Sequence, residues 1–170
     1  MRHMRHMRHS ALVFAIVMLF ALPAAASPLC DRAISNDYGS TSTPRPKLSI
    51  EMCQSVAKVA TAYGLRPSWA VAVASSESRF LPWVVSSSGA VGVMQVKPHY
   101  HCPRVFGFRI CLTSRDLIVA GVAHLADLLG EYGERDALRC YNKGRRGCRT
   151  KGAGVRYAIG VERAERRVRL

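Results

Sequence analysis

Acidic residues are scarce in this sequence, and they are unevenly placed. Its 170 residues include 11 Asp and Glu against 25 Lys and Arg, so the formal net charge is +14. No acidic residue precedes Asp31, and none lies between Glu77 and Asp116. A chain this basic suits a polyanionic partner, such as nucleic acid, an anionic membrane surface or a polyanionic wall. Aromatic residues do not alternate with basic ones as in base-stacking platforms, so we expect no nucleic-acid partner.

A hydrophobic stretch long enough to span a bilayer is also missing. The apolar run from Ala11 to Leu22 is shorter than the ~20 residues that a membrane-spanning helix needs. Three arginines precede this run, and small residues follow it over 23–26. That order is typical of a secretory signal peptide, so we predict that residues 1–26 are removed on export. The rest of the protein would then lie in the periplasm or outside the cell, with no stable membrane anchor.

The sequence has no CxxC pair, and none of its six cysteines lies at metal-ligand spacing from a histidine. We therefore expect no zinc site. An even number of cysteines behind an export signal predicts three disulfides formed in an oxidising compartment. Spacing alone does not determine the pairing. We expect Cys102–Cys111 to close one loop and the other four to tie the chain termini to the core: Cys30, Cys53, Cys140 and Cys148.

The length of the chain fits one domain, and its apolar fraction of 49% is enough for a packed core. Residues 27–48 are rich in Ser, Thr and Pro and predict an extended lead-in. The stretch from Phe80 to about Arg115 is rich in loop residues, with short strands expected over 90–96. The last residues, 163–170, form a basic tail. Helical spacing of apolar residues predicts helices over 49–63, 67–78, 113–132, 135–141 and from about 155 into the basic tail.

Local signals define the ends of these helices. Ser49 is expected to be the N-cap of the first, and Pro67 occupies the first turn of the second. Thr113 and Asp116 have the spacing of a capping box, and Gly133 ends the helix that they begin. The sequence therefore predicts a small, mainly helical, disulfide-bonded domain over 49–162.

The helix predicted over 67–78 consists almost entirely of small and apolar residues, and such a helix is buried nearly all round. Glu77 is the exception, because it places a carboxylate in the last turn, where the helix dipole disfavours negative charge. An apolar setting raises the pKa of a carboxylic acid and lets it deliver a proton near neutral pH. We expect Phe80 and Trp83 to form a dry wall beside it. The structural alternative is a Glu that caps the helix or pairs with Arg79.

The sequence around Glu77 favours a catalytic role over a structural one. Five segments of the chain, taken in order, carry a recognisable pattern. They are 77–80 (Glu-Ser-Arg-Phe), 86–95 (Ser-Ser-Ser-Gly-Ala-Val-Gly-Val-Met-Gln) with Pro98, 121–125 (Gly-Val-Ala-His-Leu), 137–144 (Ala-Leu-Arg-Cys-Tyr-Asn-Lys-Gly) and 157–161 (Tyr-Ala-Ile-Gly-Val). In order and spacing they resemble the motifs of lysozyme-like lytic transglycosylases of the soluble-transglycosylase (SLT) type. The resemblance covers about residues 50–161.

The resemblance implies a fold of the goose-lysozyme or SLT type and a role for each matching residue. Glu77 would be the single acid and base of the reaction. Ser86 and Gln95 would line the glycan cleft, Tyr141 would approach the Glu77 carboxyl, and Asn142 would shape the cleft floor. No metal or cofactor is implied. Three of these residues also have an ordinary structural interpretation: Ser86 as a loop serine, Gln95 as a strand-end amide and Tyr141 as a core phenol.

The mechanism is further constrained by the missing carboxylates. Hydrolytic glycosidases generally use two carboxyl groups, about 5–9.5 Å apart. The loops expected to form the cleft, between Glu77 and Asp116, contain no second one. A single acid suits a lyase in which the 6-hydroxyl of N-acetylmuramic acid attacks its own C1 and forms a 1,6-anhydro sugar. We therefore predict a carbon–oxygen lyase that cleaves the glycan strands of peptidoglycan.

Two alternatives remain open at this level. One is a goose-type lysozyme that hydrolyses the same bond, and the other is a catalytically idle wall-binding scaffold. A secretion or conjugation apparatus that crosses the envelope is one setting in which such an enzyme would work. The chain also departs from the family pattern, because His124 stands where the family usually has Tyr and Leu117 where it often has Asn.

Overall fold

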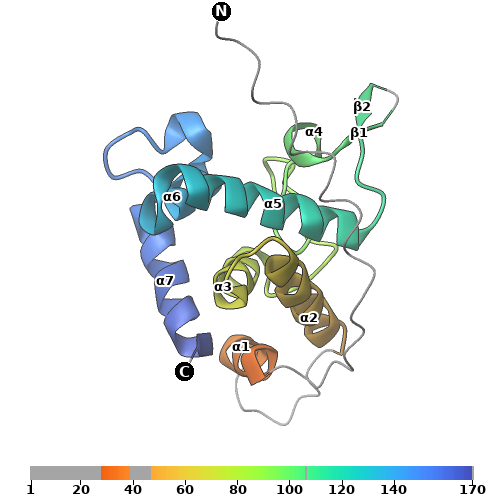
Figure 1. The fold of residues 1–170 in the computed structure, drawn as a ribbon, viewed down its shortest axis with the longest axis vertical. Helices are drawn as coiled ribbons and strands as arrows, with labels where there is room; N and C mark the ends of the chain where they lie inside the picture. Colours follow the sequence, from red (N-terminus) through yellow and green to blue (C-terminus); the bar gives the residue numbers. More distant parts are fainter. Residues whose placement is uncertain (1–27, 39–46, 106, 170) are drawn as a thin grey trace, which may run out of the picture.

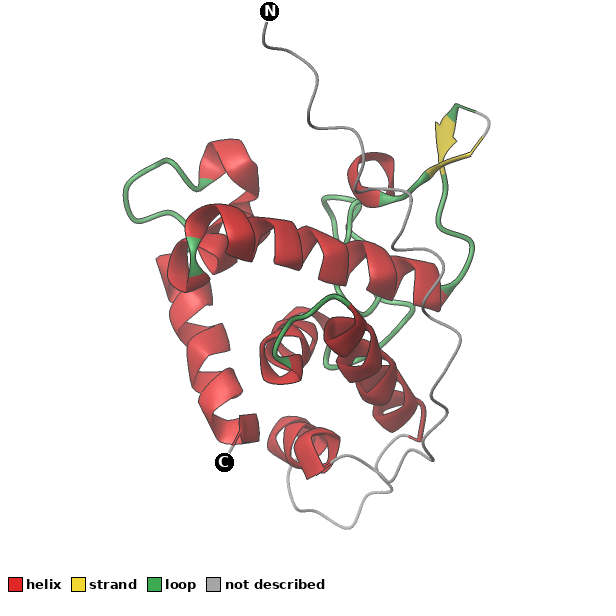
Figure 2. Ribbon diagram, in the orientation of Figure 1, coloured by secondary structure: helices red, strands yellow, loops and turns green. Residues whose placement is uncertain are grey.

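The computed structural model describes residues 28–38, 47–105 and 107–169, and the predicted signal peptide lies outside them. Within these ranges the protein is mainly helical, with one two-stranded antiparallel hairpin (Figure 2). The mainly helical fold class is thereby confirmed. The elements are α1 (Pro28–Tyr38), α2 (Lys47–Ala62), α3 (Pro67–Ser78), α4 (Pro98–His101), β1 (Arg104–Val105), β2 (Phe108–Arg109), α5 (Ser114–Tyr132), α6 (Glu134–Gly147) and α7 (Val155–Arg169).

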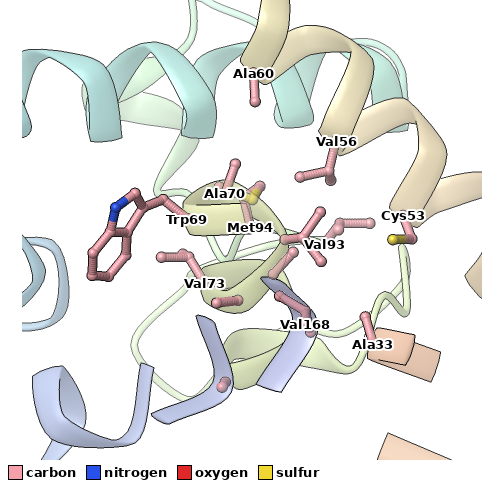
Figure 3. Packing of buried hydrophobic residues seen from close by; sticks show 14 of the residues in the cluster. Ala33, Cys53, Val56, Ala60, Trp69, Ala70, Val73, Val93, Met94 and Val168 are labelled. Carbon is pink, nitrogen blue, oxygen red and sulfur yellow. The ribbon is translucent and has the colours of Figure 1, made fainter. Parts of the chain in front are cut away.

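Helix α3 lies at the centre of the fold, with α1, α2 and α7 packed against it (Figure 1). Every residue from Ser68 to Ala74 is buried, as the small apolar composition predicts. Alanine and valine side chains let the surrounding helices approach α3 closely, and Figure 3 shows Val56, Met94 and Val168 converging on it. The main hydrophobic core is therefore built around the helix that carries Glu77.

Two predicted helix starts are confirmed. The Thr113 side chain accepts a hydrogen bond from the Asp116 backbone N–H, and the Asp116 carboxylate accepts one from the Thr113 N–H. This capping box satisfies backbone donors that the first turn of α5 would otherwise leave unpaired. Helix α3 begins at Pro67, where the missing N–H of proline costs no hydrogen bond.

The prediction of an extended lead-in is wrong for residues 28–38, which form α1. Cys30, Ala33 and Ile34 lie at helical spacing and are buried, and a disulfide joins Cys30 to Cys53 of α2. The Ser, Thr and Pro content of the following residues concealed this short amphipathic pattern. Helix α2 also begins earlier than expected, so Ser49 is buried inside the helix and is not its N-cap.

As predicted, the last helix continues into the basic tail over 163–170, and it ends at Arg169. Ala164, Glu165 and Val168 continue the buried face of α7. The buried carboxylate of Glu165 accepts a 2.8 Å hydrogen bond from Ser68 Oγ at the start of α3. The many arginines of this segment lie on the exposed side, and their charge concealed the apolar spacing.

The loop region differs from the prediction in its strands and agrees in one disulfide. Residues 90–96 form isolated bridges, Val85 with Val91 and Val91 with Val96, and no strand. The strands are instead β1 and β2, and the predicted Cys102–Cys111 disulfide closes the loop that contains them. Cys140 pairs with Cys148 only eight residues away, so this bridge closes a local loop and does not tie down a terminus. No helix in the described ranges is both long and apolar enough to cross a membrane.

Candidate active site

Glu77 lies in the last turn of α3, where the helix ends abruptly. Arg79 and Phe80 both have positive φ, 52° and 64°, a conformation that non-glycine residues rarely adopt. The buried Ser78 donates its hydroxyl to the Val93 carbonyl at 2.9 Å, and Phe80 is fully buried. These contacts hold the end of α3 against the loop that follows. They fix the backbone on which the Glu77 side chain is mounted.

The Glu77 side chain reaches a groove with a volume of about 960 Å³. All five residues singled out from the sequence line this one groove, although they come from three separate parts of the chain. They are Glu77 in α3, Ser86 and Gln95 in the loop after it, and Tyr141 and Asn142 in α6. A volume of this size lies in the range of small-molecule and sugar sites.

Burial raises the pKa of Glu77 above its usual value. A hydrogen bond opposes this effect in part, because Tyr157 of α7 donates its hydroxyl to Glu77 Oε1 at 2.6 Å. Burial and the neighbouring Glu77 charge raise the pKa of Tyr157 well above 10.0, so the phenol remains a donor. The second carboxyl oxygen, Oε2, has no hydrogen-bond partner among the described residues. One oxygen is thus fixed and the other is available to the groove.

Tyr157 takes the place that the resemblance implied for Tyr141. The Tyr141 hydroxyl donates to the Met94 carbonyl at 2.7 Å and makes no hydrogen bond to Glu77. Tyr141 is nevertheless close enough for the Glu77 charge to raise its pKa, after the larger effect of burial. Gly121 of α5 makes this arrangement possible, since a Cβ there would lie 2.4 Å from the Met94 Cβ.

Ser86 and Gln95 both form hydrogen bonds to backbone groups of the loop that forms one wall of the groove. Ser86 Oγ accepts the Ala90 N–H at 3.0 Å. Gln95 Nε2 donates to the carbonyls of Val84 and Gly92 at 2.9 and 3.0 Å. These bonds shape the wall. Asn142 is exposed within the groove, and its side chain has no hydrogen-bond partner in the described part of the chain.

Comparison with known proteins decides the family. Residues 54–158 match the family described as the transglycosylase SLT domain. The chain belongs to this family. The motif resemblance is thereby confirmed, and the match spans more than half of the chain.

A solved structure is similar to this SLT domain: an inactive mutant of the lytic transglycosylase Slt from Pseudomonas aeruginosa. The two are 26% identical with a TM-score of 0.48, and the alignment covers 68% of this chain and 22% of the other. The chain thus spans about a fifth of that protein's length. No curated protein matches the chain.

The SLT domain departs from the usual family pattern at His124, which lies among other rings that line the groove. A row of rings lies along the groove, with His101 and His124 centroids 4.1 Å apart and those of His124 and Tyr141 5.5 Å apart. Burial, followed by the charges of His101 and Arg145, lowers the pKa of His124 to about 4. His124 is therefore neutral at neutral pH and presents a flat ring where the family usually has a phenol.

The dry wall beside Glu77 is not the one expected. Trp83 is 63% exposed and does not line the groove, while Phe80 is turned into the core. The aromatic residues next to Glu77 are instead two tyrosines, Tyr141 of α6 and Tyr157 of α7. The ion pair considered for Glu77 and Arg79 is also not formed. Sequence reasoning missed Tyr157, whose only signal was its position at the start of the closing motif.

Carboxylates are otherwise kept away from the groove. Of the described residues that line it, only Glu77 carries a carboxyl group. Asp116 is occupied in the capping box, and neither Asp127 nor Glu131 reaches the groove lining. In the described ranges, no cluster of three or more His, Cys, Asp or Glu could hold a metal ion.

Proposed function

We propose that this protein is a lytic transglycosylase that cleaves the β-1,4 bond between N-acetylmuramic acid and N-acetylglucosamine in peptidoglycan, with Glu77 as its single acid and base. One observation carries the proposal. A carboxyl group with a raised pKa lines a groove in which no other described residue offers a carboxylate. Membership of the transglycosylase SLT domain family supports the same reaction class.

The proposed reaction balances with one carboxyl group. Protonated Glu77 donates its proton to the glycosidic oxygen as the bond between that oxygen and C1 breaks, which releases the N-acetylglucosamine end. The 6-hydroxyl of N-acetylmuramic acid then bonds to C1 of the same sugar, and the Glu77 carboxylate takes its proton. The product is a 1,6-anhydro ring, the enzyme returns to its protonated state, and no water is consumed.

Tyr157 is proposed as a positioning residue for this cycle. Its hydrogen bond to Glu77 Oε1 stabilises the carboxylate that forms after the first proton transfer. The same bond restricts rotation of the carboxyl group, so that Oε2 is held toward the sugar. Burial and the Tyr157 bond act on the Glu77 pKa in opposite directions, and burial is the larger effect.

The proposed setting is the periplasm or the cell exterior. Three disulfides suit an oxidising compartment, and the predicted signal peptide would direct export. Glycan strands of peptidoglycan are the proposed partner. A trans-envelope secretion or conjugation apparatus, which needs a local gap in the wall, is a proposed biological context.

The decisive experiment is the digestion of purified sacculi, followed by mass spectrometry of the released muropeptides. Anhydro ends are expected for a lyase, whereas reducing ends would identify a goose-type lysozyme. Glu77→Gln is expected to lower the release at least ~100-fold, since general acid–base catalysis contributes about 10²–10⁴-fold. Asp127→Asn is the matched control, because Asp127 is exposed on α5 and does not line the groove. Undiminished release by Glu77→Gln would refute the assignment, and binding without cleavage by the wild type would indicate a scaffold.

A further inference from the structure

The groove that contains Glu77 also has a strongly basic lining. Four of its lining residues carry a positive charge, against the single carboxylate of Glu77. We call these four residues the basic rim: Lys97, Lys143, Arg145 and Arg146. Such an excess of one sign concentrates anions in a groove with low-dielectric walls.

Most of the basic rim is available to a ligand. Arg145 is occupied, because it forms an ion pair with Glu131 and lies over the Tyr132 ring at 5.9 Å. The side chains of Lys97, Lys143 and Arg146 form no ion pair or hydrogen bond with any residue that the structure describes. Three cations therefore line the groove without a partner in the described ranges.

The backbone under the rim is fixed in place. Lys143, Arg145 and Arg146 flank a kink in α6 at Gly144, where φ is 71°. The Cys140–Cys148 disulfide closes this segment. A preorganised segment loses little conformational entropy when it binds, which increases its contribution to affinity.

Arg139, one turn before the kink, anchors the loop that follows the segment. Its guanidinium donates to the carbonyls of Ala153 and Cys148, both at 2.8 Å. The basic segment is thus held on both sides, by the core-facing Cys140 before it and by the Arg139 contacts after it.

The electrostatic field at the rim has the expected sign. Burial lowers the pKa of His101, which lines the same groove, and four neighbouring basic groups lower it further. They are Arg109, His99, Arg145 and Lys97. Among the described residues, every charge that acts on His101 thus opposes a further positive charge, which is the sign that favours an anion.

We propose that the basic rim binds the free carboxylates of peptide stems, so that the enzyme prefers glycan strands whose stems are present and negatively charged. This inference rests on the proposed function, since it assigns a specificity to the same groove. The strand would lie with its scissile bond at Glu77, and a stem would extend toward Lys143 and Arg146. A lactyl carboxylate on a sugar without its stem offers the same chemistry and is the second source to distinguish.

Three soluble substrates of equal glycan length test the proposal. The first carries uncrosslinked stems with free carboxylates, the second is the same material with its carboxylates amidated, and the third lacks stems and keeps the lactyl carboxylates. We expect amidation to raise the wild-type KM about tenfold, as two partly exposed ion pairs would. For the double variant Lys143→Gln/Arg146→Gln, the KM ratio between amidated and native strands is expected to fall toward one.

The matched control is Lys58→Gln/Arg163→Gln. It removes the same charge from exposed sites on α2 and α7 that do not line the groove, and we expect it to keep the wild-type ratio. If the KM for the stem-free strand equals that for the amidated strand, the ligand is the stem carboxylate. If it equals the KM for the native strand, that choice is overturned in favour of the lactyl carboxylate.

Failure of this inference and failure of the proposed function give different results. Equal KM values for native and amidated strands, with normal release of anhydro product, would overturn the rim alone. Absence of anhydro product from all three substrates would overturn the proposed function. In that case, the dissociation constants for native and amidated strands still test the basic rim, measured on Glu77→Gln and on its Lys143→Gln/Arg146→Gln derivative. The proposal is supported if Glu77→Gln binds native strands about tenfold more tightly and the derivative loses this preference. It is contradicted if Glu77→Gln binds both strands equally well.

Discussion

Two carboxylates lie on either side of the last turn of α3, and they differ in what they face. Glu77 belongs to that turn and points into the groove, whereas Asp37 of α1 contacts the turn from the other side, where Ser75 Oγ donates to its Oδ1 at 2.8 Å. Burial raises the pKa of both. In Asp37 this is opposed first by the Ser75 hydrogen bond and then by the charges of Arg79 and Arg167.

The comparison shows that a raised pKa does not by itself identify an acid for catalysis. Asp37 Oδ2 is buried without a hydrogen-bond partner among the described residues, and Asp37 does not line the groove. Its proton has no route to a sugar. Glu77 combines a raised pKa with an oxygen that is open to the groove. This access to the groove distinguishes a carboxyl group that can act in catalysis from one that only packs inside the fold.

The largest expected difference between the two is in turnover. Glu77→Gln should lower the rate of anhydro-muropeptide release by about 10²–10⁴-fold, because it removes the only carboxyl group among the described residues that line the groove. Asp37→Asn keeps an acceptor for Ser75 and should change the rate less than ~3-fold, within the range of a local packing change. Initial rates on purified sacculi measure both. Similar losses in the two variants would break the comparison.

Tyr157→Phe should have the next largest effect and should act on the pH profile. The lost hydrogen bond stabilised the charged form of Glu77, so the Glu77 pKa should rise further. A general acid works while it is protonated, so the alkaline fall in kcat should move to higher pH. At neutral pH we expect kcat to drop about tenfold, the equivalent of one charge-assisted hydrogen bond. An unchanged profile with only lower stability would assign Tyr157 a packing role.

Stability should respond in the opposite direction to activity. Because the folded pKa of Glu77 lies above its ordinary value of 4.5, the folded state binds this proton more tightly than the unfolded state. The resulting stabilisation is complete below about pH 4.5 and is lost as the pH rises through the folded pKa. Glu77→Gln should therefore melt a few degrees above the wild type at pH 7.5 and at the same temperature at pH 3.5. Calorimetry at both pH values checks this, with Asp127→Asn as control.

The smallest effect is expected on the α1 side. The Tyr38 hydroxyl donates to the Arg79 carbonyl at 2.9 Å, directly after the turn that carries Glu77. Tyr38→Phe should cost about 0.5–1.5 kcal/mol of unfolding free energy and lower kcat less than Tyr157→Phe does. Denaturant unfolding and kcat together test this order. If Tyr38→Phe lowered kcat more than Tyr157→Phe does, this would show that α1 helps to position Glu77 for the reaction.

Much of the fold and most of the site lining could be predicted from local signals. The capping box of α5, Pro67 at the start of α3 and the Cys102–Cys111 loop depend on neighbouring residues, so spacing reveals them. Helix α1 was missed because the burial of Cys30 comes from a distant partner, Cys53, while the composition of the helix itself is polar. The burial of Glu165 in the predicted basic tail likewise depends on a distant partner, Ser68.

By itself, the sequence determined the helical class, the buried character of α3, the anomalous Glu77 and the order of the SLT motifs. All of these are properties of residues close together in the chain. Tertiary structure alone decided which tyrosine holds Glu77, where the basic residues of 143–146 gather and which buried carboxylate reaches the groove. Tyr157 lies 80 residues from Glu77, and only the packing of α7 against α3 brings a phenol and a carboxyl group within 2.6 Å.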